Sequence, residues 1–400
     1  MEKKIIYLDH AATTATRPEV VDAMLPYLNE EFGNPSSKYY CQATRAKAAV
    51  EDAREKVARL IGASPEEIIF TAGATESTNF IIKGYLDYRK FYGDGKNHVI
   101  TSLVEHKATL NTCKYLNGEL YSNNDPTISL FGEKKRVNRG FEASFVGVTP
   151  NGEINIEDIA LKIKENTALV SILYVNNEIG TISDVEAVSA LCRNNNIAFH
   201  SDLTQALGKM QIDIKKMGID YASCSAHKIY GPKGIGAAFM KFDAYGIAPI
   251  TALMHGGEQE FGFRAGTHAV HNIVGFGKAA EIALRDLKKN EVHIKRLDEM
   301  LLKGIATIDN IHTTVDSSKR VPGIISLVVD KSDFHNERFI KKISNEVALS
   351  TGSACSAGEP SYVIQALGLG EKVNKVLRVS INKYTTKDDI TSFLELLRSI

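Results

Sequence analysis

Short runs of apolar and β-branched residues alternate with helical patterns through the first two-thirds of the chain. The pattern predicts strands over residues 66–71, 98–101, 168–175, 197–200 and 221–224, separated by helices over 76–88, 106–116 and 184–195. The run at 168–175 is almost continuously apolar, which is typical of a strand buried on both faces. This alternation predicts an α/β fold with a mainly parallel sheet between layers of helices.

The pattern changes after about residue 265. It predicts a long helix from 274 to about 308, strands at 324–329 and 377–381, and helices at 336–344, at 362–367 and from 387 onward. We therefore expect a large domain over residues 16–265 and a smaller α+β domain formed by 1–15 and 266–400. The polar segment 117–140 has the composition of an insertion.

Composition and charge narrow the class of protein. Apolar residues make up 44% of the chain and charged residues 24%, which is ordinary for a globular protein and excludes a disordered or fibrous chain. Because Lys+Arg and Asp+Glu both number 48, no global positive field favours nucleic acid or an anionic membrane. The chain also has no long uncharged apolar run and no CxxC pair. We expect a cytoplasmic protein without a membrane segment, metal site or direct contact with nucleic acid.

A lysine and a carboxylate follow neighbouring predicted strands. Lys228 comes shortly after the strand at 221–224, and Asp202 comes directly after the strand at 197–200. Ligands of open α/β sheets bind at the carboxyl ends of the strands. A partly buried amine can form a Schiff base, and a carboxylate can pair with the pyridine nitrogen of pyridoxal phosphate (PLP). The alternatives are a solvated lysine in a turn and an aspartate that caps a helix.

Two further segments could complete such a site. The turn 71–77 (TAGATES) joins a strand to a helix, where backbone N–H groups can bind a phosphate; a tight turn without ligand is the alternative. His106 follows the strand at 98–101 and could stack on a flat cofactor or shuttle protons, although a surface histidine is common. The glycine-rich 231–236 lacks the spacing of a nucleotide loop and is interpreted as a turn.

One cysteine differs from the other four. Cys355 lies in 350–360, a run of small residues with two glycines, which predicts an exposed and reactive thiol. Cys113, Cys192 and Cys224 lie in apolar settings that predict inert packing, while the setting of Cys41 decides neither way.

Taken together, the chain resembles the cysteine desulfurases, NifS-like enzymes of PLP fold type I. The resemblance runs from about residue 5 to 397. The matching motifs are 7–14 (YLDHAATT), 32–35 (FGNP), 73–77 (GATES), 105–107 (EHK), 175–180 (VNNEIG), 202–205 (DLTQ), 225–234 (SAHKIYGPKG), 255–257 (HGG), 264–267 (RAGT), 352–355 (GSAC) and Arg378.

The resemblance implies a mixed, mainly parallel seven-stranded sheet in the large domain, a homodimer and the cofactor PLP. It implies that Lys228 binds PLP covalently, that His106 stacks on the ring and that Asp202 pairs with the ring nitrogen. The remaining implied cofactor contacts are those to the ring oxygen, by Gln205 and Asn177, and to the phosphate, by Ala74, Thr75, Ser225, His227 and, from the second subunit, Thr267.

The same resemblance implies the substrate and the reaction. Arg378 would bind the carboxylate of L-cysteine, with Asn34 and Asn177 also in contact with the substrate. Cys355 would attack the substrate sulfur, so that alanine is formed and a persulfide remains on the enzyme. A protein acceptor would then receive the sulfur, for iron–sulfur assembly, tRNA thiolation or DNA phosphorothioation.

Two alternatives accompany this reading. A selenocysteine lyase or another PLP lyase would keep the cofactor and change the substrate. A non-catalytic sulfur-transfer adaptor would use the fold only for docking, although the presence of both Lys228 and Asp202 argues against it.

Three features depart from the best-known members of the family. The loop from Cys355 to Pro360 looks about two residues shorter, the segment 117–140 is about twenty residues longer, and the chain stops at Ile400 without a longer C-terminal tail. None of them involves the cofactor residues, but all three bear on the sulfur acceptor.

Overall fold

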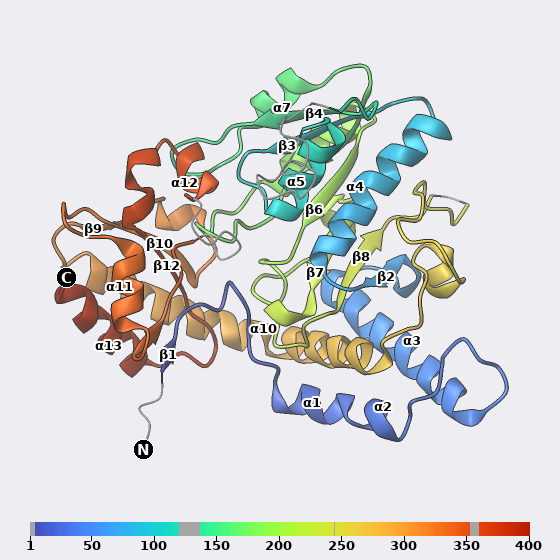
Figure 1. The fold of residues 1–400 in the computed structure, drawn as a ribbon, viewed down its shortest axis with the longest axis horizontal. Coiled ribbons are helices and arrows are strands. Elements are labelled where there is room, and N and C mark those ends of the chain that lie inside the picture. Colours follow the sequence, from blue (N-terminus) through green and yellow to red (C-terminus); the bar gives the residue numbers. More distant parts are fainter. Residues whose placement is uncertain (1–4, 120–136, 244, 353–359) are drawn as a thin grey trace, which may run out of the picture.

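A seven-stranded sheet forms the centre of the molecule (Figure 1). The computed structural model describes residues 5–119, 137–243, 245–352 and 360–400. The strand order is β2-β8-β7-β6-β5-β3-β4, and only β8 runs antiparallel to its neighbours. The strands are β2 (Ile68–Thr71), β3 (His98–Ser102), β4 (Glu142–Val146), β5 (Thr167–Ser171), β6 (Ala198–Asp202), β7 (Tyr221–Ser225) and β8 (Gly236–Met240).

Helices cover both faces of this sheet. Side chains alternate between the faces of a strand, and accordingly Ile68 and Phe70 join one core while Ile69 joins another. The first core contains residues of α3 (Cys41–Ile61), α8 (Val185–Asn194) and α10 (Val270–Ile305), and the second contains residues of α4 (Ala74–Phe91) and α5 (Lys107–Leu116). The predicted fold class, a mainly parallel sheet between helices, is therefore confirmed.

A second group of strands lies at the other end of α10 (Figure 1). The strands β9 (Ile311–Thr313), β10 (Ile324–Val329) and β12 (Val376–Ser380) form an antiparallel sheet, and β1 (Ile6–Tyr7) pairs in parallel with β11 (Val347–Ala348). Their core includes residues of α11 (Asn336–Ile343) and α13 (Lys387–Arg398). The other α-helices in the described part of the chain are α1 (Pro18–Met24), α2 (Pro26–Asn29), α7 (Ile156–Lys162), α9 (Ile214–Met217) and α12 (Tyr362–Ala366).

The long helix α10 takes part in both cores. Its first half, through Ala283, packs with the seven-stranded sheet, whereas Leu297 and later residues pack with the antiparallel sheet. The division into two domains at residue 265 stays a prediction. The two hydrophobic cores meet further along the chain, within α10.

Several predicted boundaries need correction. The strand predicted at 66–71 begins at Ile68, because Pro65–Glu67 form a 3₁₀ turn closed by a capping box between Ser64 and Glu67. The strand predicted at 168–175 ends at Ser171, although the following residues still donate backbone hydrogen bonds toward β6. Among the described residues, no helix is both long enough and apolar enough to cross a membrane.

Candidate active site

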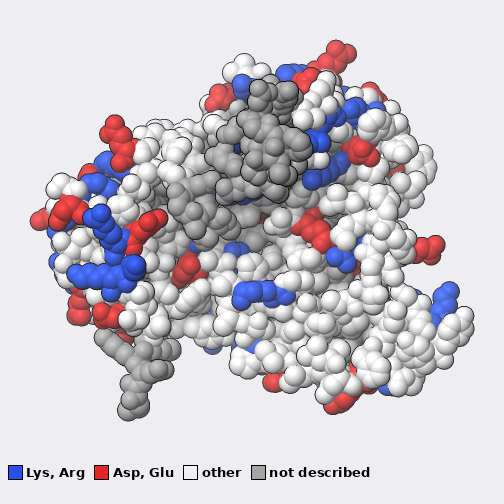
Figure 2. Space-filling model, in the orientation of Figure 1, with Lys and Arg blue, Asp and Glu red and all other residues white. Residues whose placement is uncertain are grey.

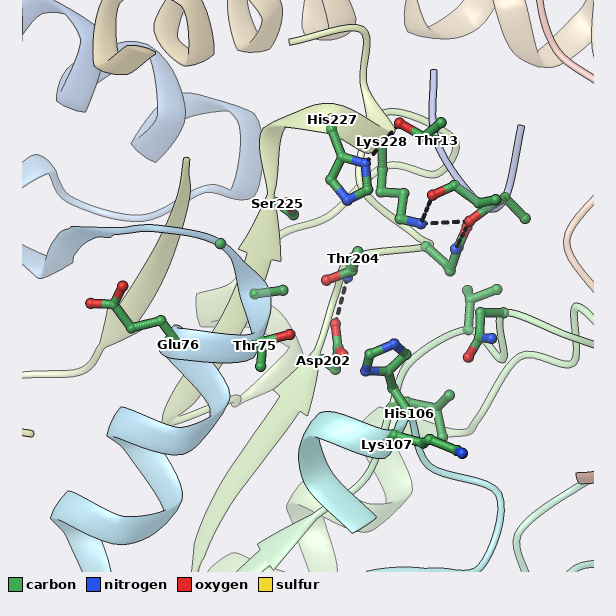
Figure 3. A pocket seen from close by; sticks show the side chains of 18 of the residues that line it. Thr13, Thr75, Glu76, His106, Lys107, Asp202, Thr204, Ser225, His227 and Lys228 are labelled. Carbon is green, nitrogen blue, oxygen red and sulfur yellow. Dashed lines mark hydrogen bonds between the residues drawn. The ribbon is translucent and has the colours of Figure 1, made fainter. Parts of the chain in front are cut away.

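A cavity of about 840 Å³ opens at the carboxyl ends of the parallel strands (Figure 3). Asp202 ends β6, Ser225 ends β7, and the turn after β2 leads into α4. The cavity brings together most of the predicted cofactor and substrate residues: Ala74, Thr75, His106, Asn177, Asp202, Gln205, Ser225, His227, Lys228 and Arg378. Sheet topology explains this convergence, because parallel strands end at the same edge.

Lys228 points into this cavity from a short 3₁₀ turn after β7 (Figure 3). Its Nζ donates hydrogen bonds of 2.6 Å to the carbonyl oxygens of Ala11 and Ala12. Thr13, the next residue, lies with its hydroxyl 3.1 Å from Nδ1 of His227. The N-terminal segment therefore orients the lysine. This segment carries one of the family motifs, 7–14, but nothing in its sequence indicates the contact with Lys228.

The N-terminus of α4 provides a site for an anion. The first N–H groups of a helix have no partner within the helix, and the helix dipole adds positive character there. Gly73 precedes this end with φ 152°, and β8 begins so close that a Cβ at Gly236 would lie 2.6 Å from Cα of Gly73. Only glycine at 236 allows this close approach, while the positive φ at 73 favours glycine there. Ala74 and Thr75, at this end of α4, line the cavity together with Ser225 and His227 (Figure 3), so an anion in the cavity can reach the helix N-terminus.

Asp202 and His106 lie on the opposite side of the cavity from the Lys228 turn (Figure 3). One oxygen of the buried Asp202 accepts a 2.9 Å hydrogen bond from the N–H of Thr204, but no helix begins there. The predicted alternative of a helix cap is therefore not realised. His106 caps α5 instead, and its Nδ1 accepts from the N–H of Ala108 at 3.1 Å. Burial lowers the pKa of His106, so the neutral ring carries its proton on Nε2.

Arg378 lies almost fully buried in the lining of the cavity. Its Nη2 donates to Asp9 at 2.7 Å, and Nη1 donates to the carbonyl oxygens of Asn177 and Gly352. Within the described part of the chain, its Nε–H has no hydrogen-bond partner. A buried donor without a partner is costly, and a substrate carboxylate would satisfy it.

Two buried carboxyl groups near the cavity were not predicted. Glu178 lines the cavity and accepts a 2.6 Å hydrogen bond from Ser361, and burial raises its pKa. Glu105 directly precedes His106 in the sequence. Its carboxyl group accepts hydrogen bonds from the hydroxyl of Ser102 and from the N–H of Leu173. Burial raises the pKa of Glu105 to about 8. Sequence alone gave no sign of this, because charged residues are usually exposed.

Two predicted site residues that the structure describes are not in this cavity. Asn34 and Thr267 are exposed and are absent from its lining. Cys355 lies outside the described residues, although Gly352, just before it, lines the cavity. The predicted inert cysteines Cys113, Cys192 and Cys224 are buried, whereas Cys41 is exposed.

The chemistry of this residue set fits PLP. The amine of Lys228 suits the carbonyl carbon of that cofactor, and the carboxylate of Asp202 suits its ring nitrogen. The planar ring of His106 suits the face of the cofactor ring, and the N-terminus of α4 suits the phosphate. Across the described ranges, no three His, Cys, Asp or Glu side chains lie close enough together to bind a metal ion.

Comparison with known proteins identifies the class. The family description "Aminotransferase class-V" matches residues 6–121 and 131–393. The cysteine desulfurase IscS of Neisseria meningitidis serogroup A / serotype 4A is 40% identical over 400 residues, which cover 99% of this chain and 92% of that protein. Among solved structures, a NifS-like protein superposes with a TM-score of 0.85 at 32% identity and covers 99% of both chains. The structure "SspA in complex with cysteine" gives a TM-score of 0.78 at 32% identity and covers 95% of this chain and 99% of its own.

The chain therefore belongs to the class-V aminotransferase family of PLP-dependent enzymes. Within that family it belongs to the cysteine desulfurases. The predicted family, enzyme class and cofactor are confirmed. The two matched stretches leave out residues 122–130, which lie inside the predicted insertion.

Proposed function

We propose that this cysteine desulfurase converts L-cysteine to L-alanine and retains the sulfur as a persulfide on Cys355. The convergence of Lys228, Asp202, His106 and Arg378 in one cavity is the observation that best supports this assignment. PLP, when bound, would withdraw electrons from the substrate Cα and so stabilise the negative charge that develops there.

Lys228 would bind the cofactor covalently and then act on the substrate. Its Nζ, held by the carbonyl oxygens of Ala11 and Ala12, would accept the proton from Cα once the substrate amine has replaced it. Asp202 would keep a proton on the ring nitrogen, and His106 would stack on the ring with its Nε2–H available as a donor. The phosphate would bind at the start of α4, with Ala74, Thr75, Ser225 and His227 around it.

Arg378 would hold the substrate carboxylate, because its Nε–H points to no other partner among the described residues. Asn177 and Asn34 would contact the substrate as well, and the exposed position of Asn34 would suit a contact made across a dimer. Cys355 would attack as a thiolate. The new S–S bond forms as the substrate Cβ–S bond breaks, the bonding electrons stay on the carbon skeleton, and protonation of that skeleton gives alanine.

A homodimer is the assembly that the surface supports. Exposed large apolar side chains gather along α1, α2 and the following segment, including Leu28, Phe32 and Tyr39. Gln259 Nε2 lies 3.4 Å from the hydroxyl of Ser36, so the loop that leads to Thr267 adjoins this surface. A second copy packed here would cover the apolar side chains and would bring Thr267 toward the phosphate of its partner.

Sedimentation tests the dimer. Leu28→Glu should give a monomer that binds PLP weakly, because a buried charge opposes packing of the apolar surface. Leu161→Glu, at a position 82% exposed on α7, is the matched control and should remain dimeric. A monomer of the wild-type protein that retains PLP tightly would refute the shared site.

The sulfur acceptor is proposed to be a protein in the cytoplasm, reached without direct binding of nucleic acid. Figure 2 supports the last point, because positive and negative side chains are interspersed on the face that it shows. Iron–sulfur assembly, tRNA thiolation and DNA phosphorothioation remain the candidate destinations. Turnover of cysteine against selenocysteine separates the proposed reaction from a selenocysteine lyase.

The experiment that tests the central proposal is Cys355→Ser. The variant should keep the PLP chromophore and still bind cysteine, but release almost no alanine or sulfide. Lys228→Ala is the complementary variant and should lose the chromophore of the resting enzyme. Desulfuration by Cys355→Ser at the wild-type rate would move the nucleophile to another residue, with the exposed Cys41 as the next candidate.

A further inference from the structure

A second lysine lies directly behind the site. Lys209 donates two hydrogen bonds of 2.8 Å to Gln205, one to its backbone oxygen and one to its side-chain Oε1. Gln205 is buried, and its Nε2 donates to the carbonyl oxygen of Ala11 at 2.9 Å. That same oxygen accepts the hydrogen bond from Lys228. A continuous chain of contacts therefore joins Lys209 to the cofactor lysine.

The chemistry of an ammonium group fixes the direction of this chain. In its charged form Lys209 can only donate, so in that form the side-chain oxygen of Gln205 faces it. The NH₂ group of Gln205 must then point the other way, toward Ala11 and the main cavity. One of its two hydrogens binds Ala11, and the other is available to an acceptor in the cavity that Gln205 lines. Without Lys209, the amide could rotate and present its oxygen instead.

The surroundings of Lys209 are positively charged or neutral. It lines a small second cavity with His10, Lys228, Tyr230 and Lys383, and no carboxylate is found among the described residues of that lining. Burial, together with the charges of Lys228 and Arg378, lowers the pKa of Lys209 to about 7. Arg378 itself is paired with Asp9, and burial lowers the pKa of His10 to about 4, so His10 is neutral.

We propose that Lys209 is a positioning residue that orients the amide of Gln205, so that its NH₂ group donates to the ring oxygen of bound PLP. This inference rests on the proposed cofactor orientation. A donor at the ring oxygen stabilises the negative charge there, and the protonated form of the bound cofactor then has a lower pKa.

The test measures the absorbance of the bound cofactor as a function of pH, in holoenzyme without substrate. Lys209→Met should raise the midpoint of this titration by about one pH unit. Lys209→Arg keeps the charge and the donors and should stay within about 0.3 units of wild type. Lys383→Met is the matched control: Lys383 lines the same small cavity and burial lowers its pKa to about 8, but it has no hydrogen bond to Gln205. It should change the midpoint little.

A double-mutant cycle with Gln205→Ala separates orientation from simple charge repulsion. If Lys209 acts through Gln205, Lys209→Met should shift the midpoint less than half as far in the Gln205→Ala background. An equal shift in both backgrounds, or no shift in Lys209→Met, overturns the inference. These results test only the role of Lys209. If the proposed function were wrong, the wild-type protein itself would lack the chromophore that depends on Lys228.

Discussion

Arg54 and Glu260 form a two-point ion pair in the interior of the protein. Both guanidinium Nη atoms donate to the carboxylate at 2.8 Å, and both side chains are almost completely buried. Glu260 also accepts from the N–H of Phe70 at 2.6 Å and lies 2.6 Å from His268 Nε2. It does so with φ 48°, in the left-handed region that glutamate rarely adopts. The pair therefore fixes the loop that precedes Thr267.

Glu260→Gln should lower the free energy of unfolding by about 3 kcal/mol or more at neutral pH, because it leaves the buried charge of Arg54 without its counter-ion. The hydrogen bonds from Arg54 and His268 hold the pKa of Glu260 at about 2, below its ordinary value of 4.5. The stabilisation is thus present above pH 4.5 and is lost as the pH falls through the folded value. Urea unfolding measures it.

Glu51→Gln is the matched control for that prediction. Glu51 also contacts Arg54, at 3.1 Å, but its side chain is half exposed, so its loss should cost less than about 1 kcal/mol. Equal losses in the two variants would contradict a special role for the buried pair.

A mixed dimer with one Glu260→Gln subunit should lose PLP from the wild-type subunit's site, if the loop serves the partner.

Glu105 should make stability depend on pH in the opposite sense. Burial raises its pKa from 4.5 to about 8, so between these values the folded state holds a proton that the unfolded state releases. The stability is full below pH 4.5 and falls by at most about 1.4 kcal/mol per unit as the pH rises through the folded value. Urea unfolding at several pH values should show this decline in the wild type and a flatter profile in Glu105→Gln. A decline of equal slope in Glu105→Gln would refute the assignment, and the exposed Glu157→Gln should retain the wild-type slope.

Arg378→Lys should separate substrate binding from cofactor binding. Lysine can still pair with Asp9 but cannot present the planar fork that binds a carboxylate at two points. We expect PLP to be retained and the apparent Kd for cysteine to rise about 10–100-fold, as measured by the change in cofactor absorbance. Arg320→Lys is the control, because Arg320 forms an equally buried pair with Asp298 outside the cavity. It should reduce stability and leave cysteine affinity unchanged; an equal loss of affinity there would contradict the assignment.

The hydrophobic pattern of the sequence predicted the strands and helices that have a clear periodicity of their own. The strand at 324–329 was predicted at its observed bounds, because six apolar and small residues between a turn and a polar segment leave few alternatives. Lys228 and Asp202 were found because strand ends are visible in the sequence. The helix Cys41–Ile61 was not predicted, although alanines and valines recur along it at helical spacing.

Long-range contacts could not be predicted from the residues alone. The bond from Lys228 to Ala11 joins residues 217 positions apart, and nothing near either one indicates the other. Burial of Glu105 and Lys209 depends in the same way on packing between distant segments. The roles of Asn34 and Thr267 came only from the family resemblance, and their exposed positions in one chain leave these roles as predictions.

The predicted insertion can be removed with little strain. Residues 120–136 lie outside the described residues, but the residues on either side of them meet: the N–H of Val137 donates to the carbonyl oxygen of Gly118 at 3.0 Å. A variant that lacks 120–136 should therefore fold, with unfolding free energy within about 1 kcal/mol of wild type, since closing a shorter loop costs no additional entropy.

We expect this deletion to preserve alanine formation in the presence of a small thiol, because the cofactor and substrate residues that line the cavity come from other segments of the chain. Transfer of radiolabelled sulfur from cysteine to proteins of a cell extract should decrease, if the segment guides the acceptor. A solvated loop without function is the alternative, and it predicts wild-type values in both assays. A loss of alanine formation would contradict both interpretations, because it would require the segment to support the cavity itself.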